Sequence, residues 1–173
     1  LVPNALEAGK FESRYWAHLP DSLSRDDCKT NWLHMYSKGA LTPTAAATVI
    51  KQFNAVDQGG QVHVTLDTFL GWKVIVRTLC DWRLLHRAGK KLQNISIEQQ
   101  SASINIWPLF EEDWYRSLHG VEALRNLINL NLYLAALRSL PAQRAGVYLQ
   151  ENQGWEPSLI HAWNVSGHGK LIG

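Results

Sequence analysis

Short apolar segments alternate with longer amphipathic segments along most of this chain. The short segments are rich in β-branched and aromatic residues, which is typical of strands. The longer segments repeat their apolar residues at helical spacing, which predicts helices between the strands. The predicted strands are 31–36, 61–66, 103–107, 145–150 and one that begins at 171–172, and the predicted helices are 43–55, 68–92, 109–140 with a break at Gly120, and 155–165.

This alternation predicts βαβ units with right-handed crossovers, and therefore an α/β fold. We expect a Rossmann-like, mainly parallel sheet with helices on both faces. A chain of 173 residues, 46% of them hydrophobic, is long enough for one domain with a sizeable core. We expect a single Rossmann-like α/β domain over residues 1–173, truncated at its C-terminus because no helix or turn follows the last strand.

Charge, cysteines and motifs exclude several classes of protein. With 17 Lys and Arg against 15 Asp and Glu, the net charge of +2 is too small to predict nucleic-acid binding. Cys28 and Cys80 form no C-x-x-C pair, and no histidine lies in an H-E-x-x-H or H-x-H motif, so we expect neither a disulfide framework nor a metal. We also expect no cofactor, because no glycine-rich phosphate loop is present. No apolar run is long enough to cross a bilayer, and the cytoplasm is the expected location.

A polar loop follows the fourth predicted strand. It contains Gln150, Glu151 and Asn152, and Glu156 lies where the next helix begins. Because the carboxyl ends of parallel strands form the ligand crevice of open α/β sheets, these are candidate site residues. We expect Glu151 to be partly buried, which would raise its pKa toward the range useful for proton transfer. The two carboxamides suit the hydroxyls of a sugar, and side chains at strand ends also tie down loops.

Two further carboxylates follow predicted strand ends, Asp67 after the second and Asp113 after the third. They could converge with the polar loop on one rim. Each also has a purely structural interpretation: Asp67 caps a helix, and Asp113 belongs to an acidic first turn that complements the helix dipole. The structural interpretation of Glu156 is that it caps the turn at Asn152.

The predicted helix 68–92 combines tryptophans with basic residues. Its tryptophans are Trp72 and Trp82, and its basic residues are Lys73, Arg77, Arg83, His86, Arg87, Lys90 and Lys91. Such a helix can lie on an anionic membrane surface. The alternative is a core helix with a solvated basic side and a cationic last turn.

The most distinctive block of sequence is YLQENQGWE at 148–156, continued by LIHAW at 159–163 and GHGKLIG at 167–173. Earlier blocks are NWLH at 31–34, QVHVTLD at 61–67, and WPL at 107–109 followed by Asp113 and Trp114. Together they resemble a bacterial family of surface carbohydrate biosynthesis proteins, and more distantly the transferases of the acidic sugar Kdo.

The resemblance implies a GT-B-like glycosyltransferase with two Rossmann-like halves, of which this chain would be the N-terminal half and inactive alone. It implies transfer of a sugar from a nucleotide sugar to a glycan or lipid-linked acceptor of O-antigen or capsule synthesis, peripheral to the inner face of the cytoplasmic membrane. Glu151 would be the general acid or base, Glu156, Asp67 and Asp113 would shape the pocket, and Gln150 and Asn152 would hold hydroxyls. Two alternatives stay open: a non-catalytic carbohydrate- or partner-binding module, and a membrane-docking subunit.

Overall fold

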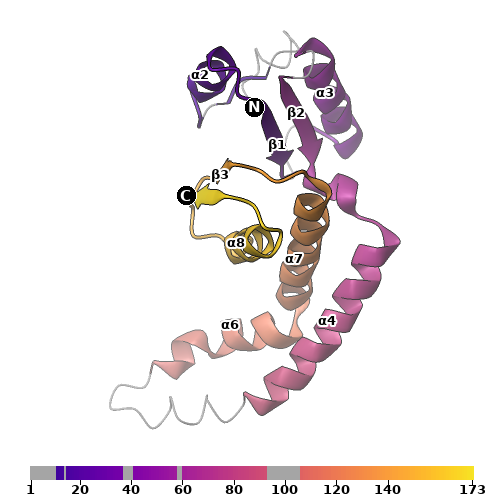
Figure 1. Ribbon diagram of the computed structural model, residues 1–173. Helices are drawn as coiled ribbons and strands as arrows, with labels where there is room; N and C mark the ends of the chain where they lie inside the picture. The colour runs from indigo at the N-terminus through magenta and orange to yellow at the C-terminus, as the bar shows by residue number, and fades with distance from the viewer. Residues whose placement is uncertain (1–10, 14, 37–40, 58–59, 93–105) are drawn as a thin grey trace. The chain divides into compact units, whose positions relative to one another are not determined.

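The computed structural model describes residues 11–13, 15–36, 41–57, 60–92 and 106–173 (Figure 1). The chain divides into two compact units, one ending at Thr68 and the other beginning at Phe69. Each unit is described by itself below. None of the described helices is both long enough and apolar enough to cross a membrane.

Unit 1 is built on a parallel pair of strands joined by a helix. Its elements are α2 (Leu19–Arg25), β1 (Thr30–His34), α3 (Pro43–Val56), β2 (Gln61–Thr65) and the 3-10 turn η1 (Leu66–Phe69), whose last residue opens unit 2. Thr42 caps α3 by accepting a hydrogen bond from the Ala45 N–H at 3.3 Å, and Pro43 occupies the first turn. Phe53 of α3 is fully buried, as expected for the apolar face of an amphipathic helix.

Strands β1 and β2 pair in parallel, with Thr30 opposite Gln61 and Trp32 opposite His63. The Asn54 side chain of α3 fixes the helix on this pair. Its Oδ1 accepts the His63 N–H at 2.7 Å, and its Nδ2 donates to the His63 carbonyl at 2.8 Å. These bonds pair both the N–H and the carbonyl of His63, a buried strand residue. Buried backbone groups without a partner would lower the stability of the fold.

Unit 2 is mainly helical. Its elements are α4 (Trp72–Lys91), α6 (Trp107–His119), α7 (Val121–Ser139), β3 (Ala145–Val147), α8 (Glu156–Val165) and β4 (Lys170–Ile172). Helix α7 packs against α4, α6 and α8, and it supplies half of the buried apolar residues described in the unit. Its buried apolar residues are Ala123, Leu132, Tyr133, Ala136 and Leu137. The break at Gly120 between α6 and α7, and the end of α7 before Pro141, confirm the prediction for this region.

The βαβ segment of unit 2 packs tightly around Trp163 of α8. A Cβ built on Gly146 of β3 would lie 2.5 to 2.9 Å from three ring atoms of Trp163, so only glycine lets the strand approach this closely. The Trp163 Nε1 donates to the Gly169 carbonyl at 2.7 Å. His168 acts structurally in the turn before β4: its Nδ1 accepts the Gln143 N–H at 3.2 Å, and its Nε2 lies 3.0 Å from the Leu137 carbonyl.

The predicted single Rossmann-like sheet with helices on both faces is wrong. The described residues form two separate two-stranded parallel sheets, β1–β2 and β3–β4, and most of unit 2 is helical. Parallel pairing within each βαβ segment agrees with the local pattern. The third predicted strand falls partly outside the described residues, at 103–105, and its last residue, Trp107, begins α6. The GT-B-like half that the resemblance implies requires such a sheet, so this fold does not support it.

The physical reason lies in the helix-on-helix packing of unit 2. The strands β3 and β4 have three residues each, too short to cover a helical layer. The apolar residues of α7 face α4, α6 and α8 instead of a sheet. The chain divides into two compact units, and the prediction of one domain over residues 1–173 stays a prediction.

Candidate functional site

The polar loop between β3 and α8 is organised around one buried carboxylate. Glu156, only 5% exposed, is the first residue of α8. Its Oε1 accepts the Glu151 N–H at 2.8 Å and the Gln153 N–H at 2.7 Å. Between these residues Asn152 has a φ of 56°, a left-handed conformation that asparagine tolerates better than most residues. Glu156 is therefore the anchor that fixes the shape of the loop, which agrees with the structural interpretation of this residue.

The other candidate residues of this loop are exposed. Gln150, Glu151 and Asn152 are all exposed and begin three residues after Val147, where β3 ends. The partial burial predicted for Glu151 is not found, because the loop turns Glu156 inward in its place. The exposed side chains of the loop are thus the Glu151 carboxylate and the carboxamides of Gln150, Asn152 and Gln153, on a backbone that Glu156 holds.

The two more distant carboxylates do not belong to this loop. Asp113 is exposed in α6, in the same acidic run as Glu112, which forms an ion pair with Arg116 one turn later. Asp67 is exposed in η1, in the other unit of the chain. The structure thus brings together Gln150, Glu151, Asn152 and Glu156, and leaves the predicted roles of Asp67 and Asp113 as predictions.

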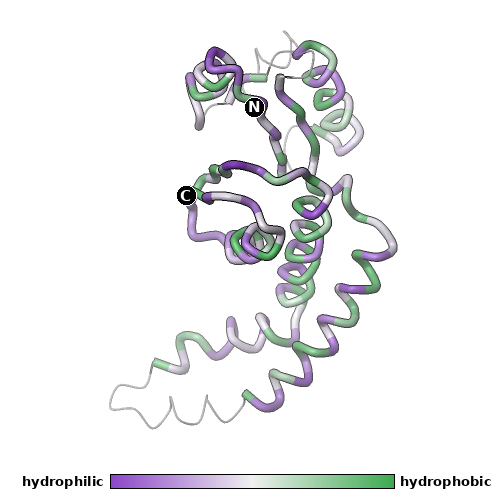
Figure 2. The backbone as a smooth tube through the Cα atoms, viewed as in Figure 1, coloured by the Kyte–Doolittle hydropathy of each residue, from purple (hydrophilic) through white to green (hydrophobic). Residues whose placement is uncertain are grey.

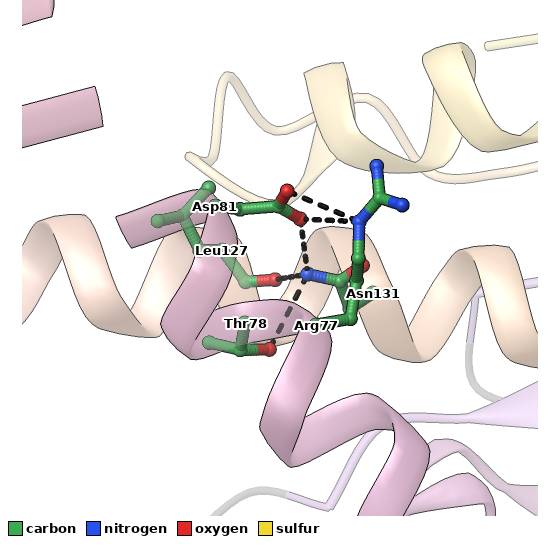
Figure 3. Close-up of polar contacts among 5 residues, drawn as sticks. All are labelled: Arg77, Thr78, Asp81, Leu127 and Asn131. Atoms are coloured by element: carbon green, nitrogen blue, oxygen red, sulfur yellow. Dashed lines mark hydrogen bonds and ion pairs between the residues drawn. The ribbon is translucent and has the colours of Figure 1, made fainter. Parts of the chain in front are cut away.

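A second set of polar contacts fixes how α4 lies against α7 (Figure 3). The buried Asn131 amide of α7 donates to the Leu127 carbonyl at 3.1 Å, to the Asp81 Oδ2 at 3.0 Å and to the Thr78 hydroxyl at 3.3 Å. Asp81 in turn accepts from the Arg77 Nε at 3.1 Å. Because Thr78 and Asp81 both belong to α4, this polar cluster determines which face of α4 turns inward.

The opposite face of α4 is exposed and apolar at its N-terminal end. Trp72 is 75% exposed, and Ile75, Val76, Leu79 and Trp82 are also exposed. Along the flank of the helix lies a shallow hollow of about 540 Å³ that runs from Trp72 and Lys73 to Leu84. In Figure 2, hydrophobic and hydrophilic residues alternate along this helix, as they do in a helix with both apolar and charged faces.

A pair of stacked histidines in unit 1 has no counterpart in the sequence predictions. The His34 Nε2 and the His63 Nδ1 lie 3.1 Å apart, and the two rings stack with centroids 5.3 Å apart. Phe11, Trp32 and Phe53 surround the His63 ring. Burial lowers the pKa of both histidines to about 4, and the charge of His63 contributes to the lower pKa of His34. Both imidazoles are therefore neutral at pH 7.

Unit 2 holds a second histidine pair, between α4 and α6. The Nδ1 atoms of His86 and His119 lie 2.8 Å apart, and Gly89 lies so close to the His119 ring that a Cβ there would be 3.1 Å from it. Within the described residues, no three His, Cys, Asp or Glu side chains come together as a metal site.

The sequence holds one indication of the His34–His63 pair. Trp32 and His34 are two residues apart in a predicted strand, and this spacing puts both side chains on one face of the strand.

Comparison of the chain with protein-family models, with curated proteins and with solved structures finds no significant match. The resemblance to surface carbohydrate biosynthesis proteins therefore stays a prediction from the sequence.

Proposed function

We propose that this chain takes part in sugar transfer to a bacterial surface polysaccharide, and that the loop 150–156 contacts the sugar. The observation that carries the proposal is the pair of hydrogen bonds from the loop to the buried Glu156, which hold Gln150, Glu151 and Asn152 in an exposed row after β3. The same segment is the most distinctive part of the sequence block that resembles the carbohydrate family. Support therefore comes from geometry and sequence at the same residues.

The chemistry of transfer assigns a role to each exposed side chain. In sugar transfer an acceptor hydroxyl forms a bond to the donor sugar, the bond from that sugar to the nucleotide breaks, and the nucleotide leaves with the bonding electrons. The step is easier when a carboxylate takes up the proton of the hydroxyl. The Glu151 carboxylate is open to such a hydroxyl, and the carboxamides of Gln150 and Asn152 both donate and accept hydrogen bonds, as sugar hydroxyls require. Glu156 acts through the backbone of the loop and is a positioning residue.

Sugar binding without transfer is a second function, and the exposure of Glu151 favours it. A carboxylate that acts as general acid or base works best where water is excluded, whereas Glu151 is exposed to solvent. In this alternative the same loop residues hold a glycan and leave it unchanged.

Turnover and binding separate these two functions. A panel of nucleotide sugars that includes CMP-Kdo, offered with acceptor glycans, is tested on the 173-residue chain and on any longer protein that contains it. We expect Glu151→Gln to lower turnover by about 100-fold or more, the scale of general acid–base catalysis, with little effect on glycan binding. Glu111→Gln, at an exposed position of α6, is the matched control and leaves turnover unchanged.

Two other outcomes contradict sugar transfer through Glu151. Wild-type turnover in the Glu151→Gln variant removes Glu151 from the chemistry. Glycan binding without turnover, weakened by Gln150→Ala and by Asn152→Gly, establishes the binding function; glycine is used at position 152 because it keeps the left-handed backbone.

A further inference from the structure

Helix α4 carries two stripes of side chains, and only one of them is used inside unit 2. The inward stripe has Val74, Thr78, Asp81, Leu85 and Gly89, spaced at helical intervals, and it faces α7 and α6. The outward stripe has Trp72, Ile75, Val76, Leu79 and Trp82, spaced i, i+3, i+4, i+7 and i+10. An exposed stripe of five large apolar residues on one helix is a larger apolar surface than folding of this unit requires.

The orientation of α4 is fixed, so the exposure of the outward stripe is a property of the fold. The amide of Asn131 bonds to Thr78 and Asp81 on the inward side (Figure 3). Rotation of α4 to bury the outward stripe would break these bonds and would bury basic side chains such as Arg83 and Lys90. The outward stripe therefore needs a partner outside unit 2.

Charge is distributed unevenly along the same helix. Six of the twenty residues of α4 are Lys or Arg, and Asp81, on the inward stripe, is its single acidic residue. The apolar stripe occupies the N-terminal half, whereas Arg83, Arg87, Lys90 and Lys91 occupy the C-terminal half, all four exposed. At 1.5 Å per residue the helix is about 30 Å long, so an apolar section of about 15 Å adjoins a cationic section of similar length.

We propose that this outward face of α4 docks on an anionic phospholipid membrane. The Trp72 end enters the boundary between headgroups and acyl chains, where tryptophan side chains are favoured, and the cationic end lies against lipid phosphates. The charge of the face is complementary to an anionic surface. A bilayer fits this face because the apolar section can enter the acyl-chain boundary while the four exposed cations meet lipid phosphates, and α4 has no exposed acidic side chain.

Vesicle binding tests the proposal. The chain is centrifuged with phosphatidylcholine vesicles and with vesicles containing 30% phosphatidylglycerol, at low and high salt. We expect binding to the anionic vesicles alone, weakened by salt, with a blue shift of tryptophan fluorescence. Arg83→Gln with Arg87→Gln should weaken binding by roughly 30-fold, from the attraction of two cations to an anionic surface. Leu79→Ser should abolish most of the blue shift.

A matched control removes the same charge elsewhere. Lys51→Gln with Arg138→Gln, both at exposed positions of other helices, is expected to bind anionic vesicles nearly as the wild type does. Because all the substituted residues are exposed, circular dichroism and the melting temperature should not change.

Equal binding to both kinds of vesicle, or an equal loss in the two double variants, overturns the proposal. Binding to a poly-glutamate peptide and not to vesicles would replace the membrane with an acidic protein as the partner. The variants that test sugar transfer lie in the loop 150–156, and those that test membrane docking lie in α4. Failure of one proposal therefore leaves the other standing.

Discussion

Glu156 shows how one buried carboxylate can hold a functional loop. Its Oε1 accepts two backbone N–H groups that have no partner in a regular element, and its position in the first turn of α8 adds the favourable helix dipole. Hydrogen bonds to a charged acceptor contribute more to stability than hydrogen bonds to a neutral acceptor do.

Removal of this carboxylate should loosen the loop. We expect Glu156→Ala to lower the free energy of unfolding by about 2 kcal/mol, because two partly buried N–H groups lose their charged acceptor. Glu156→Gln keeps one oxygen as acceptor and should lose roughly half as much. Urea unfolding followed by circular dichroism measures both changes. Equal stability of the Ala variant and the wild type would show that water replaces the carboxylate without cost.

The chemical type of this residue was visible in the sequence, whereas its role depended on the turn. Glu151 and Glu156 are both carboxylates near a strand end, and the sequence pattern predicted partial burial for Glu151. The left-handed backbone at Asn152 brings the N–H groups of Glu151 and Gln153 to one acceptor, and a strand-and-helix pattern does not reveal such a conformation. The exposed positions of Gln150 and Asn152 are consistent with the predicted loop.

At the scale of elements, local capping and breaking signals located several helix ends, although α4 begins at Trp72 and not at the predicted residue 68. Thr42 with Pro43, Gly120 and Pro141 mark the helix ends that the structure has. The predicted strands 31–36, 61–66, 145–150 and 171–172 lie within a few residues of β1, β2, β3 and β4, whereas Trp107, the last residue of the predicted strand 103–107, begins α6. Which strands share a sheet depends on contacts between distant segments, and no single-sequence pattern encodes these contacts.

The polar cluster between α4 and α7 should matter more for stability than the surface ion pair attached to it. We expect Asn131→Leu to lower the free energy of unfolding by about 1 to 3 kcal/mol, since Thr78 and Asp81 lose a buried donor. Arg77→Ala should change it by no more than about 0.5 kcal/mol, because the Arg77 side chain is 70% exposed. Thermal or urea unfolding of both variants gives the comparison. A larger loss in Arg77→Ala would show that Arg77 is what keeps Asp81 in place.

At the scale of the whole molecule, the two units should respond differently to acid. The pKa of His34 and His63 is about 4 in the folded chain and 6.5 in the unfolded chain. The unfolded chain therefore binds more protons below pH 6.5, so unit 1 loses stability as the pH falls from 6.5 toward 4, by up to about 1.4 kcal/mol per pH unit for each histidine.

Hydrogen exchange, corrected for its intrinsic pH dependence, measures this loss within each unit. We expect protection of β1 and β2 to fall steeply between pH 6.5 and 4.5. His34→Phe, which removes one titrating ring and keeps an aromatic ring in the cluster, should reduce the slope. The same slope in the variant and the wild type would assign the acid sensitivity to other groups.

The two parallel strand pairs also affect how the chain folds during its synthesis. Thr30 pairs with Gln61, and Ala145 pairs with Lys170, so each sheet closes between segments separated by a single helix and its loops. Closing a segment of this length costs less loop entropy than joining segments that lie farther apart along the chain. The first pair lies wholly within unit 1, so it can form on the ribosome while the residues of α7 and α8 are still being added.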